Sequence, residues 1–462
     1  MLYFFFAYFL EREQFAILLT LYFGLFASFY IIVKTHTNNL SILIGLTLLF
    51  RLIFLFAIPN LSQDFYRFIW DGRMILEGLN PYLHLPETFI QQGTSPVYNA
   101  ANLYDGMGQL NGSHYTNYPP LNQLCFLIAA VFANKSILGS VIVLRSILIL
   151  ADIGILYFGQ KLLKAMQLPV SLIFWYLLNP FVIIELTGNL HFEPVMLFFL
   201  VWSLYKIQQQ KWIWAAVLLA CSVSIKLIPL LFLPLFYQWF VKSKQSFNDN
   251  EMLKQVQHDN NVSLLQKPAF VGITRLFAFY GIVIGTTILL FLPFASTALV
   301  ENYANSVGLW FRNFEFNASF YYLFREIGYL FRGYNEIAII GKIVPVLTLL
   351  FLTGITFFRK NNSIKQLITA LLFGLSFYYF TTTTMHPWYL ATLILLTVFT
   401  KYRFPIVWSL VIVFSYSAYN NETYQENFWF LGLEYIIVYG FLAYEVFMKT
   451  NRLKESRSKT RD

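Results

Sequence analysis

Apolar stretches of about 20 residues recur from one end of this sequence to the other, separated by short polar runs. A stretch of that length is what an α-helix needs to cross a hydrocarbon layer about 30 Å thick. Within lipid only helices or the strands of a closed barrel satisfy every backbone polar group. Barrel strands alternate apolar and polar residues over about ten positions, unlike these unbroken runs. The sequence therefore predicts an all-α, polytopic transmembrane helical bundle.

Composition agrees with that class and argues against several others. Hydrophobic residues make up 58% of the chain and charged residues only 12%, about half the charged fraction of a soluble domain. The net charge is +9, but the Lys and Arg residues stand at the ends of apolar runs. This pattern indicates membrane orientation and no nucleic-acid partner. Both cysteines, Cys125 and Cys221, lie in apolar stretches, so neither a disulfide framework nor a Cys/His zinc site is expected.

The apolar runs predict about 13 spans. We place them at 14–33, 40–58, 137–158, 169–186, 190–208, 211–224, 227–241, 270–293, 336–358, 366–382, 388–400, 404–418 and 428–448. The first ten residues, MLYFFFAYFL, are too short to span, and we expect either the stump of a helix or a true start upstream.

These spans divide the chain into six segments. They are N-terminal transmembrane helices (1–58), a first large external loop with interfacial helices (59–136), central transmembrane helices including a cytoplasmic loop at 242–268 (137–293), a second external segment (294–335), C-terminal transmembrane helices (336–448) and a basic cytoplasmic tail (449–462).

The orientation follows from the basic residues. The Lys- and Arg-rich connections all fall on one side of the predicted bundle, which we assign to the cytoplasm. The segments 59–136 and 294–335, with the turns around His191 and His386, then face outward. Residues 119–134 would reverse this order if they crossed the membrane, so we predict a re-entrant or interfacial helix there. A bacterial inner-membrane protein with its site facing the periplasm is the expected arrangement.

One external stretch, SQDFYRFIWDGRMILEGLNPY at 62–82, gathers charges among aromatic residues. Its pattern predicts a helix over 62–78 with Ser62 as N-cap and Asp64 in the first turn. Arg67 is spaced to meet both Asp64 and Asp71, at i+3 and i+4, and we interpret Asp71 mainly as an ion-pair partner. For Asp64 we favour catalysis, because desolvation near the lipid boundary raises a carboxyl pKa and makes a useful base near neutral pH.

Other polar residues of the external face suit a phosphorylated sugar. Amide, carboxyl and aromatic side chains of the first loop can bind carbohydrate, although Tyr also belongs at any membrane interface. We predict that His386 contacts a phosphate. The cationic candidates also fit plain snorkelling anchors, and a metal held by His191, Glu193 and His386 lacks tight ligand spacing, so no metal is expected. Besides Asp64, the candidate substrate-binding residues are His386, His191, Glu193, Asp71, Arg73, Arg312, Lys226 and Tyr118.

In the span 137–158, Arg145 and Asp152 lie seven positions apart on one face. Charges within a membrane span often mark function. We favour interhelical ion pairing for these two.

At these positions the chain resembles the GT-C superfamily of polytopic glycosyltransferases, in particular its bacterial mannosyltransferase-like members. The motifs that carry the resemblance spread from residue 60 to about 390. They are DFYRFIWDGRMILEGLNPY, NYPPLNQ, SIKLIPLLFLP and HPWYL, with GNLHFEP and FRNFEFNASFYY similar too.

The resemblance implies transfer of a hexose, by analogy mannose, from a polyprenyl-phosphate carrier to an extracytoplasmic glycan or glycolipid acceptor. It implies inversion at the anomeric centre, with Asp64 as the catalytic base. No convincing DxD motif is present, which agrees with metal-independent members and with no cofactor beyond the lipid-linked donor. A missing first helix would depart from the family pattern.

Two other function classes compete with glycosyl transfer. One is a transporter or flippase, and the other a polymerase or ligase of lipid-linked cell-surface polysaccharide. Transporters of the inverted-repeat type place broken helices and polar groups near the bilayer midplane. Here the polar groups cluster at one external face, which favours the enzyme. The sugar, the acceptor and the linkage stay open.

Overall fold

The computed structural model describes residues 1–242, 268–312, 314–420 and 425–448, and all regular structure in those ranges is helical. One isolated parallel bridge, between Phe316 and Thr384, is the sole β-type pairing within them. The prediction of an all-α bundle is confirmed. The loop expected at 242–268 and the tail expected at 449–462 fall, apart from Lys242 and Pro268, outside the described residues.

Six helices of the described chain are long and apolar enough to cross a membrane. A seventh candidate is the pair Val170–Leu177 and Val182–Gly188, bent by 63°. The chain is therefore a multi-pass membrane protein. The six are α2 (Phe15–Thr35), α8 (Ile137–Ala165), α14 (Pro268–Phe291) continued by η6 (Leu292–Phe294), α17 (Ile337–Phe358), α18 (Ile364–Thr381) and α21 (Phe428–Ala443) continued by η9 (Tyr444–Met448).

The remaining predicted spans are also helical, but each is too short to meet the same criterion. Short or broken helices are tolerated at membrane depth when other helices surround them. The figure of about 13 crossings therefore stays a prediction. These segments are α3 (Leu40–Ile53), η1 (Val170–Ile173), α9 (Phe174–Leu177), η2 (Val182–Gly188), α10 (Glu193–Gln208), α11 (Trp212–Val223), η3 (Ile228–Phe236), α12 (Tyr237–Lys242), η7 (Pro387–Leu390), α19 (Ala391–Val398), α20 (Phe404–Val411) and η8 (Ile412–Asn420).

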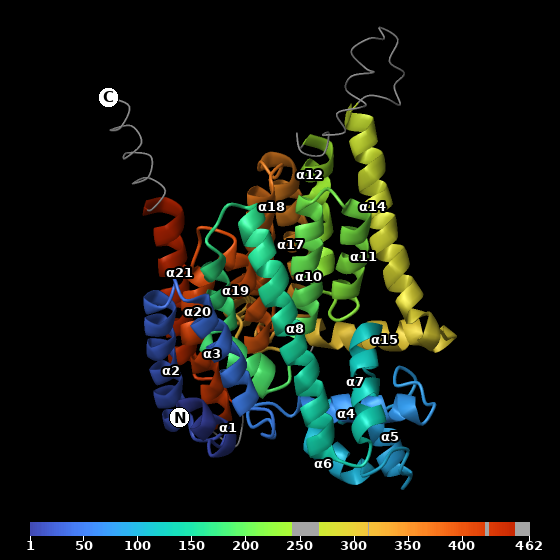
Figure 1. Cartoon of the computed structure of the whole chain (residues 1–462). Coiled ribbons are helices and arrows are strands. Elements are labelled where there is room, and N and C mark those ends of the chain that lie inside the picture. Colours follow the sequence, from blue (N-terminus) through green and yellow to red (C-terminus); the bar gives the residue numbers. More distant parts are fainter. Residues whose placement is uncertain (243–267, 313, 421–424, 449–462) are drawn as a thin grey trace, which may run out of the picture.

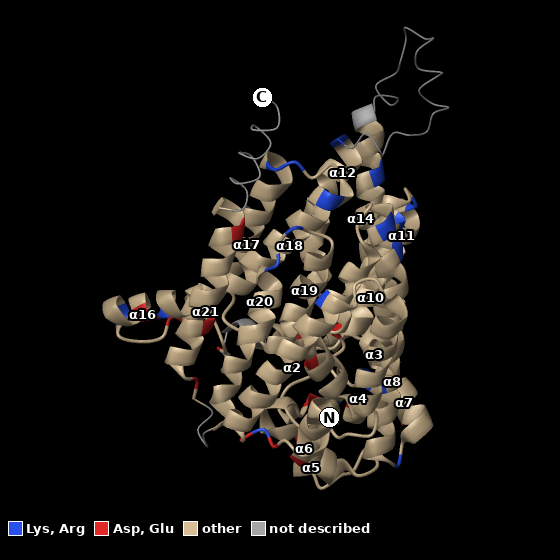
Figure 2. Ribbon diagram, turned by 60° about the vertical axis from the view of Figure 1, so that its left-hand side comes forward, with Lys and Arg blue, Asp and Glu red and all other residues tan. Residues whose placement is uncertain are grey.

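The helices of the predicted external loops gather at one end of the bundle (Figure 1). In Figure 2, many of the Lys and Arg residues lie toward the opposite end, around α11, α12 and the top of α14. The gathered helices are α1 (Leu2–Tyr8), α4 (Asp64–Leu76), α5 (Pro86–Gln91), α6 (Ala100–Gly112) and α7 (Pro120–Ala133), with α15 (Thr297–Arg312) lying across the bundle nearby and α16 (Phe320–Arg332) projecting from its side.

Helix α4 is fixed to α7 by a close backbone crossing. A Cβ atom on Gly72 would lie 2.2 Å from the carbonyl oxygen of Phe126, so only glycine permits this approach. One turn earlier, the rings of Phe68 and Phe126 stack with centroids 4.6 Å apart. This packing, continued from α7 onto α8, holds the first turn of α4 in a defined place.

The buried charges of α8 are satisfied in two ways. Asp152 pairs with Arg51 of α3, with Nε and Oδ2 2.7 Å apart, which confirms interhelical pairing for this residue. Arg145 forms no ion pair with any residue that the structure describes, so that half of the expectation is wrong. Its guanidinium donates to backbone carbonyls, among them those of Thr187 and Ala57 at 2.8 and 2.7 Å. The breaks in η2 and after α3 leave these carbonyls without intrahelical partners.

Candidate functional site

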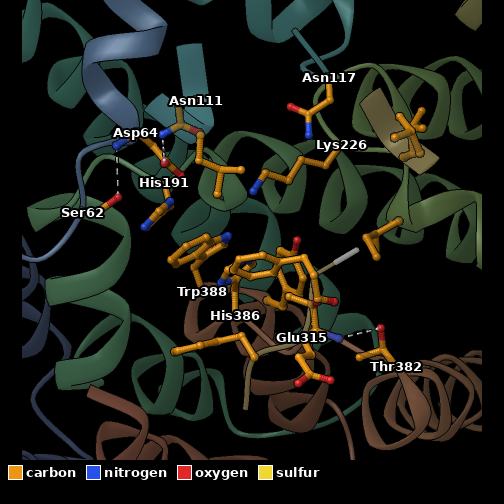
Figure 3. Close-up of a pocket in the computed structure, with 18 of the residues that line it drawn as sticks. Ser62, Asp64, Asn111, Asn117, His191, Lys226, Glu315, Thr382, His386 and Trp388 are labelled. Carbon is orange, nitrogen blue, oxygen red and sulfur yellow. Dashed lines mark hydrogen bonds between the residues drawn. The ribbon is translucent and has the colours of Figure 1, made fainter. Parts of the chain in front are cut away.

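A cavity of about 1150 Å³ lies between the external-loop helices and the bundle (Figure 3). Its volume is slightly above the range typical for small-molecule sites, roughly 300–1,000 Å³. Its walls come from residues far apart in the chain. Of the predicted site residues, it brings together Asp64, Tyr118, His191, Lys226 and His386.

Asp64 is the first residue of α4 and stands half-buried in the cavity wall. The Asn111 side-chain amide of α6 donates to its Oδ1 at 3.3 Å. Burial raises the pKa of Asp64 above its ordinary value, while Asn111, Lys226 and Arg12 act in the opposite direction. A carboxylate in such a setting can accept a proton closer to neutral pH than one in water.

The start of α4 differs in detail from its prediction. Gln63 occupies the N-cap position without a side-chain hydrogen bond that caps the helix, and the Ser62 hydroxyl instead accepts from the Asp64 backbone N–H at 3.4 Å. Ser62 therefore lies one position too early to cap the helix. It braces the backbone of Asp64 directly.

Arg67 turns away from Asp64 and toward the interior. Its Nε lies 2.8 Å from Asp71 Oδ1, and its Nη1 donates to the carbonyls of Asn111 and His114. Gln123 donates to the second oxygen of Asp71 at 3.0 Å. The ion-pair interpretation of Asp71 is confirmed, while the second pairing of Arg67, with Asp64, is wrong. The backbone carbonyls at the end of α6 accept the hydrogen bonds that the Arg67 guanidinium would otherwise donate to a second carboxylate.

Three aromatic rings form the opposite wall. Trp388 stacks against His191, with centroids 3.8 Å apart, and against His386, with centroids 4.5 Å apart. His386 has an extended backbone before Pro387, as expected for a residue that precedes proline. Burial, followed by the charge of Lys226, lowers the pKa of His386 to about 3. The imidazole is therefore neutral near pH 7 in this environment.

Lys226 stands between the two walls and is only 18% exposed. Its Nζ is paired with Glu193 Oε1. Glu193 itself is buried and does not line the cavity, so its role toward a substrate would be indirect. The pair holds one cation at a fixed place beside Asp64, His191 and His386.

Two further predicted residues lie outside the cavity, and the side chain of a third is not described. Arg73 is fully buried and donates to the Tyr98 carbonyl at 2.6 Å, and neither it nor Asp71 lines the cavity. Both are occupied by contacts within the first external loop. Arg312 is the last residue of α15, and its side chain is outside the described part of the structure.

Arg12 lines the cavity and was missed from the sequence. It follows α1, and its guanidinium lies 3.4 Å from the ring centroid of Tyr419. The signal was the ERE triplet at 11–13, which interrupts two apolar runs.

The cavity also has an apolar portion. Side chains of η3, of the turn before it, of α15 and of α17 line this portion. These residues are Leu227, Ile228, Leu230, Leu231, Val307, Pro345 and Leu349.

The metal site considered for His191, Glu193 and His386 is not formed. Within the described ranges, no three His, Cys, Asp or Glu residues are placed to hold a metal ion. The stacking of both imidazoles on Trp388, and the pairing of Glu193 with Lys226, direct these groups to other partners.

Comparison with known proteins gives one result. No curated protein matches the chain. A family described as alpha-(1->6)-mannopyranosyltransferase, N-terminal domain, matches residues 8–242. This range contains Asp64, His191 and Lys226, whereas His386 and Trp388 lie beyond it. Because the match covers half of the 462 residues, the chain belongs to the alpha-(1->6)-mannopyranosyltransferase family and is a membrane mannosyltransferase.

Proposed function

We propose that the protein transfers a mannosyl group from a polyprenyl-phosphate carrier to a sugar hydroxyl, with inversion, and that Asp64 is the general base. The observation that carries the proposal is the position of Asp64. It lines the main cavity, accepts one side-chain hydrogen bond from a neutral amide, and forms no ion pair among the described residues. Asp71, seven positions later, is neutralised by Arg67 and lies outside the cavity.

The opposite wall suits a phosphate leaving group. Lys226 supplies a fixed positive charge, and His386 supplies an imidazole. The negative charge of a bound phosphate would raise the pKa of His386 from its low value, so that the imidazole takes up a proton from water more readily. A protonated imidazole donates a charge-assisted hydrogen bond, which is stronger than a neutral one.

The apolar portion of the cavity supports a lipid carrier. Leucine, isoleucine and valine side chains of η3 and α15, with Pro345 and Leu349 of α17, line the same cavity as Lys226 and Asp64. Burial of a hydrocarbon chain there would contribute about 25 cal/mol for each Å² removed from water. A polyprenyl tail fits this lining and a nucleotide does not.

The chemical step is a single displacement. The acceptor oxygen attacks the anomeric carbon from the face opposite the phosphate. The new C–O bond forms as the bond to the phosphate oxygen breaks, and its electron pair leaves with the phosphate. The hydroxyl proton passes to the Asp64 carboxylate. If the product is alpha-linked, as the family description indicates, inversion requires a beta-linked donor.

Orientation completes the proposal. The cavity lies at the end of the bundle that carries α4 to α7, and many of the Lys and Arg residues lie toward the opposite end (Figure 2). Under the positive-inside rule, this supports a site on the periplasmic face of a bacterial inner membrane.

A transfer assay tests the proposal. Purified protein in proteoliposomes should mannosylate an oligosaccharide from polyprenyl-phosphate beta-mannose and not from a nucleoside-diphosphate mannose, and NMR of the product should show an alpha linkage. Turnover with the nucleotide donor would overturn the lipid-carrier assignment, and a beta linkage would overturn inversion. Right-side-out spheroplasts should modify an impermeant acceptor. Modification confined to inverted vesicles would reverse the orientation.

A further inference from the structure

A second cavity, of about 380 Å³, adjoins the first on the side of Ser62. Arg12, Ser62 and Gln63 line both cavities, and Phe65 and Tyr66, which follow Asp64 in α4, line the second. The second cavity therefore lies beside the backbone that carries the proposed base, while the Asp64 side chain itself lines the first cavity. Its volume falls within the range of about 300–1,000 Å³ for small-molecule sites.

The position of the second cavity matches the geometry of an inverting displacement. The attacking oxygen and the leaving phosphate must occupy opposite faces of the anomeric carbon. In Figure 3, Ser62 lies on one side of Asp64, and Lys226 lies on the other. With the phosphate beside Lys226 and His386, the acceptor reaches Asp64 from the side of Ser62.

The chemistry of the wall is dominated by oxygen acceptors. Asn60 donates its amide hydrogens to the carbonyls of Phe6 and Leu10, at 2.9 Å each, which leaves its Oδ1 free to accept. Gln63 likewise donates to Met107 at 3.2 Å and retains its Oε1. Glu11 and Glu13 add two carboxylates, which can only accept when ionised. Hydroxyl groups are the natural donors to such a surface.

The charge of the wall discriminates among glycans. Two carboxylates accompany one guanidinium, and that guanidinium is stacked on Tyr419. The net negative charge repels uronates and phosphorylated sugars. A firm aromatic face adds to the site, because the Tyr66 ring packs over Gly106, where a Cβ atom would come within 2.7 Å.

We infer that this second cavity, the Ser62-side cavity, binds an uncharged acceptor glycan of at least two sugar units, one unit at Asp64 and the next beside Glu11 and Glu13. The inference rests on the proposed function, since it takes Asp64 as the base. It adds the acceptor class and the residues that select it.

The experiment compares Glu11→Gln/Glu13→Gln with wild-type protein, using a mannose monosaccharide, a neutral mannose disaccharide and a phosphorylated disaccharide as acceptors. In wild type the neutral disaccharide should be preferred over the other two. The double variant should raise the KM for the neutral disaccharide about tenfold, the size of a lost hydrogen bond to a charged group. The double variant should also prefer the neutral disaccharide less strongly over the monosaccharide and over the phosphorylated disaccharide. Its KM for the donor should be unchanged.

The matched control is Glu77→Gln, an exposed glutamate beyond the end of α4 that lines neither cavity. It should behave as wild type. Unchanged acceptor KM and unchanged length preference in the double variant would overturn the inference. Failure of the proposed function has a separate readout, because it would appear as normal turnover in Asp64→Asn with any acceptor.

Discussion

The two sides of the main cavity differ in charge. On the α4 side, a single carboxylate is bordered by a neutral amide, and burial raises its pKa. On the far side, an ammonium group is already paired with Glu193, and two imidazoles rest on Trp388. One side can take up a proton and the other can accommodate an anion. The separation lets a displacement send its proton and its leaving group in different directions.

The largest expected effect tests the α4 side of the cavity, where Asp64 is the proposed base. Asp64→Asn retains the shape of the side chain but cannot accept a proton at neutral pH, so kcat should fall by about 10²–10⁴-fold. Donor binding, measured by equilibrium titration, should survive. Normal turnover in this variant would remove Asp64 from the chemistry.

Asp71→Asn is the matched control on the same helix. It leaves Arg67 buried beside a neutral amide, and breaking a buried pair costs about 3–5 kcal/mol of stability. Thermal unfolding in detergent should show that loss, while the fraction that stays folded turns over normally. The reverse pattern in the two variants would mean that Asp71 is the base.

The next effect in size concerns the far side. His386→Ala removes the proposed phosphate donor, so the donor KM should rise about tenfold or more, as expected for loss of a charge-assisted bond. The acceptor KM should be unaffected. His84→Ala is the control, because His84 belongs to the first external loop and does not line the cavity. Equal donor KM values in both variants would assign His386 a packing role against Trp388.

The smallest expected effect is a change in the pKa of Asp64, which the pH dependence of kcat/KM would report. Asn111 stabilises the charged carboxylate, so Asn111→Ala should raise the pKa of Asp64 further. Since the base must be deprotonated, the acid limb of kcat/KM should move to higher pH. This hydrogen bond to a charged group is long, at 3.3 Å, so the lower end of the usual range applies, about 1.5 kcal/mol, which corresponds to roughly 1 pH unit. The plateau at high pH should persist.

Asn117→Ala is the control for that shift. Asn117 lines the same cavity, but the groups that shift the pKa of Asp64 are Asn111, Lys226 and Arg12. Its acid limb should coincide with that of wild type. A limb that stays in place in Asn111→Ala, or moves to lower pH, would show that another group controls the profile.

The fold class could be predicted because the length of an apolar run is a local property. Every predicted span contains helix, and the membrane-bundle prediction holds. The number of crossings could not be predicted in the same way. Segments such as α3 and α11 are shorter than the hydrocarbon layer, and whether they cross depends on the helices that surround them.

The sequence singles out Asp64 because a carboxylate is costly beside a span, and the structure places this residue in the cavity wall. Its catalytic role stays a prediction. Partners were less predictable. From spacing alone, Arg67 reaches Asp64 and Asp71 equally well, and only the carbonyls of Asn111 and His114 decide between them. The stacking of Trp388 on His191 joins positions almost 200 residues apart. No local pattern carries such information.

The assembly of the far side from late residues affects how the protein is made. More than 300 positions separate Asp64 from His386, and at about 5–20 residues per second a ribosome needs tens of seconds to cover them. During that interval the external loop is complete while Trp388 has not been synthesised. A nascent chain therefore contains Asp64, His191 and Lys226 before His386 and Trp388 have been made. If the proposed mechanism holds, the phosphate side stays incomplete until those last two residues are in place, and a partly synthesised chain should not consume carrier lipid.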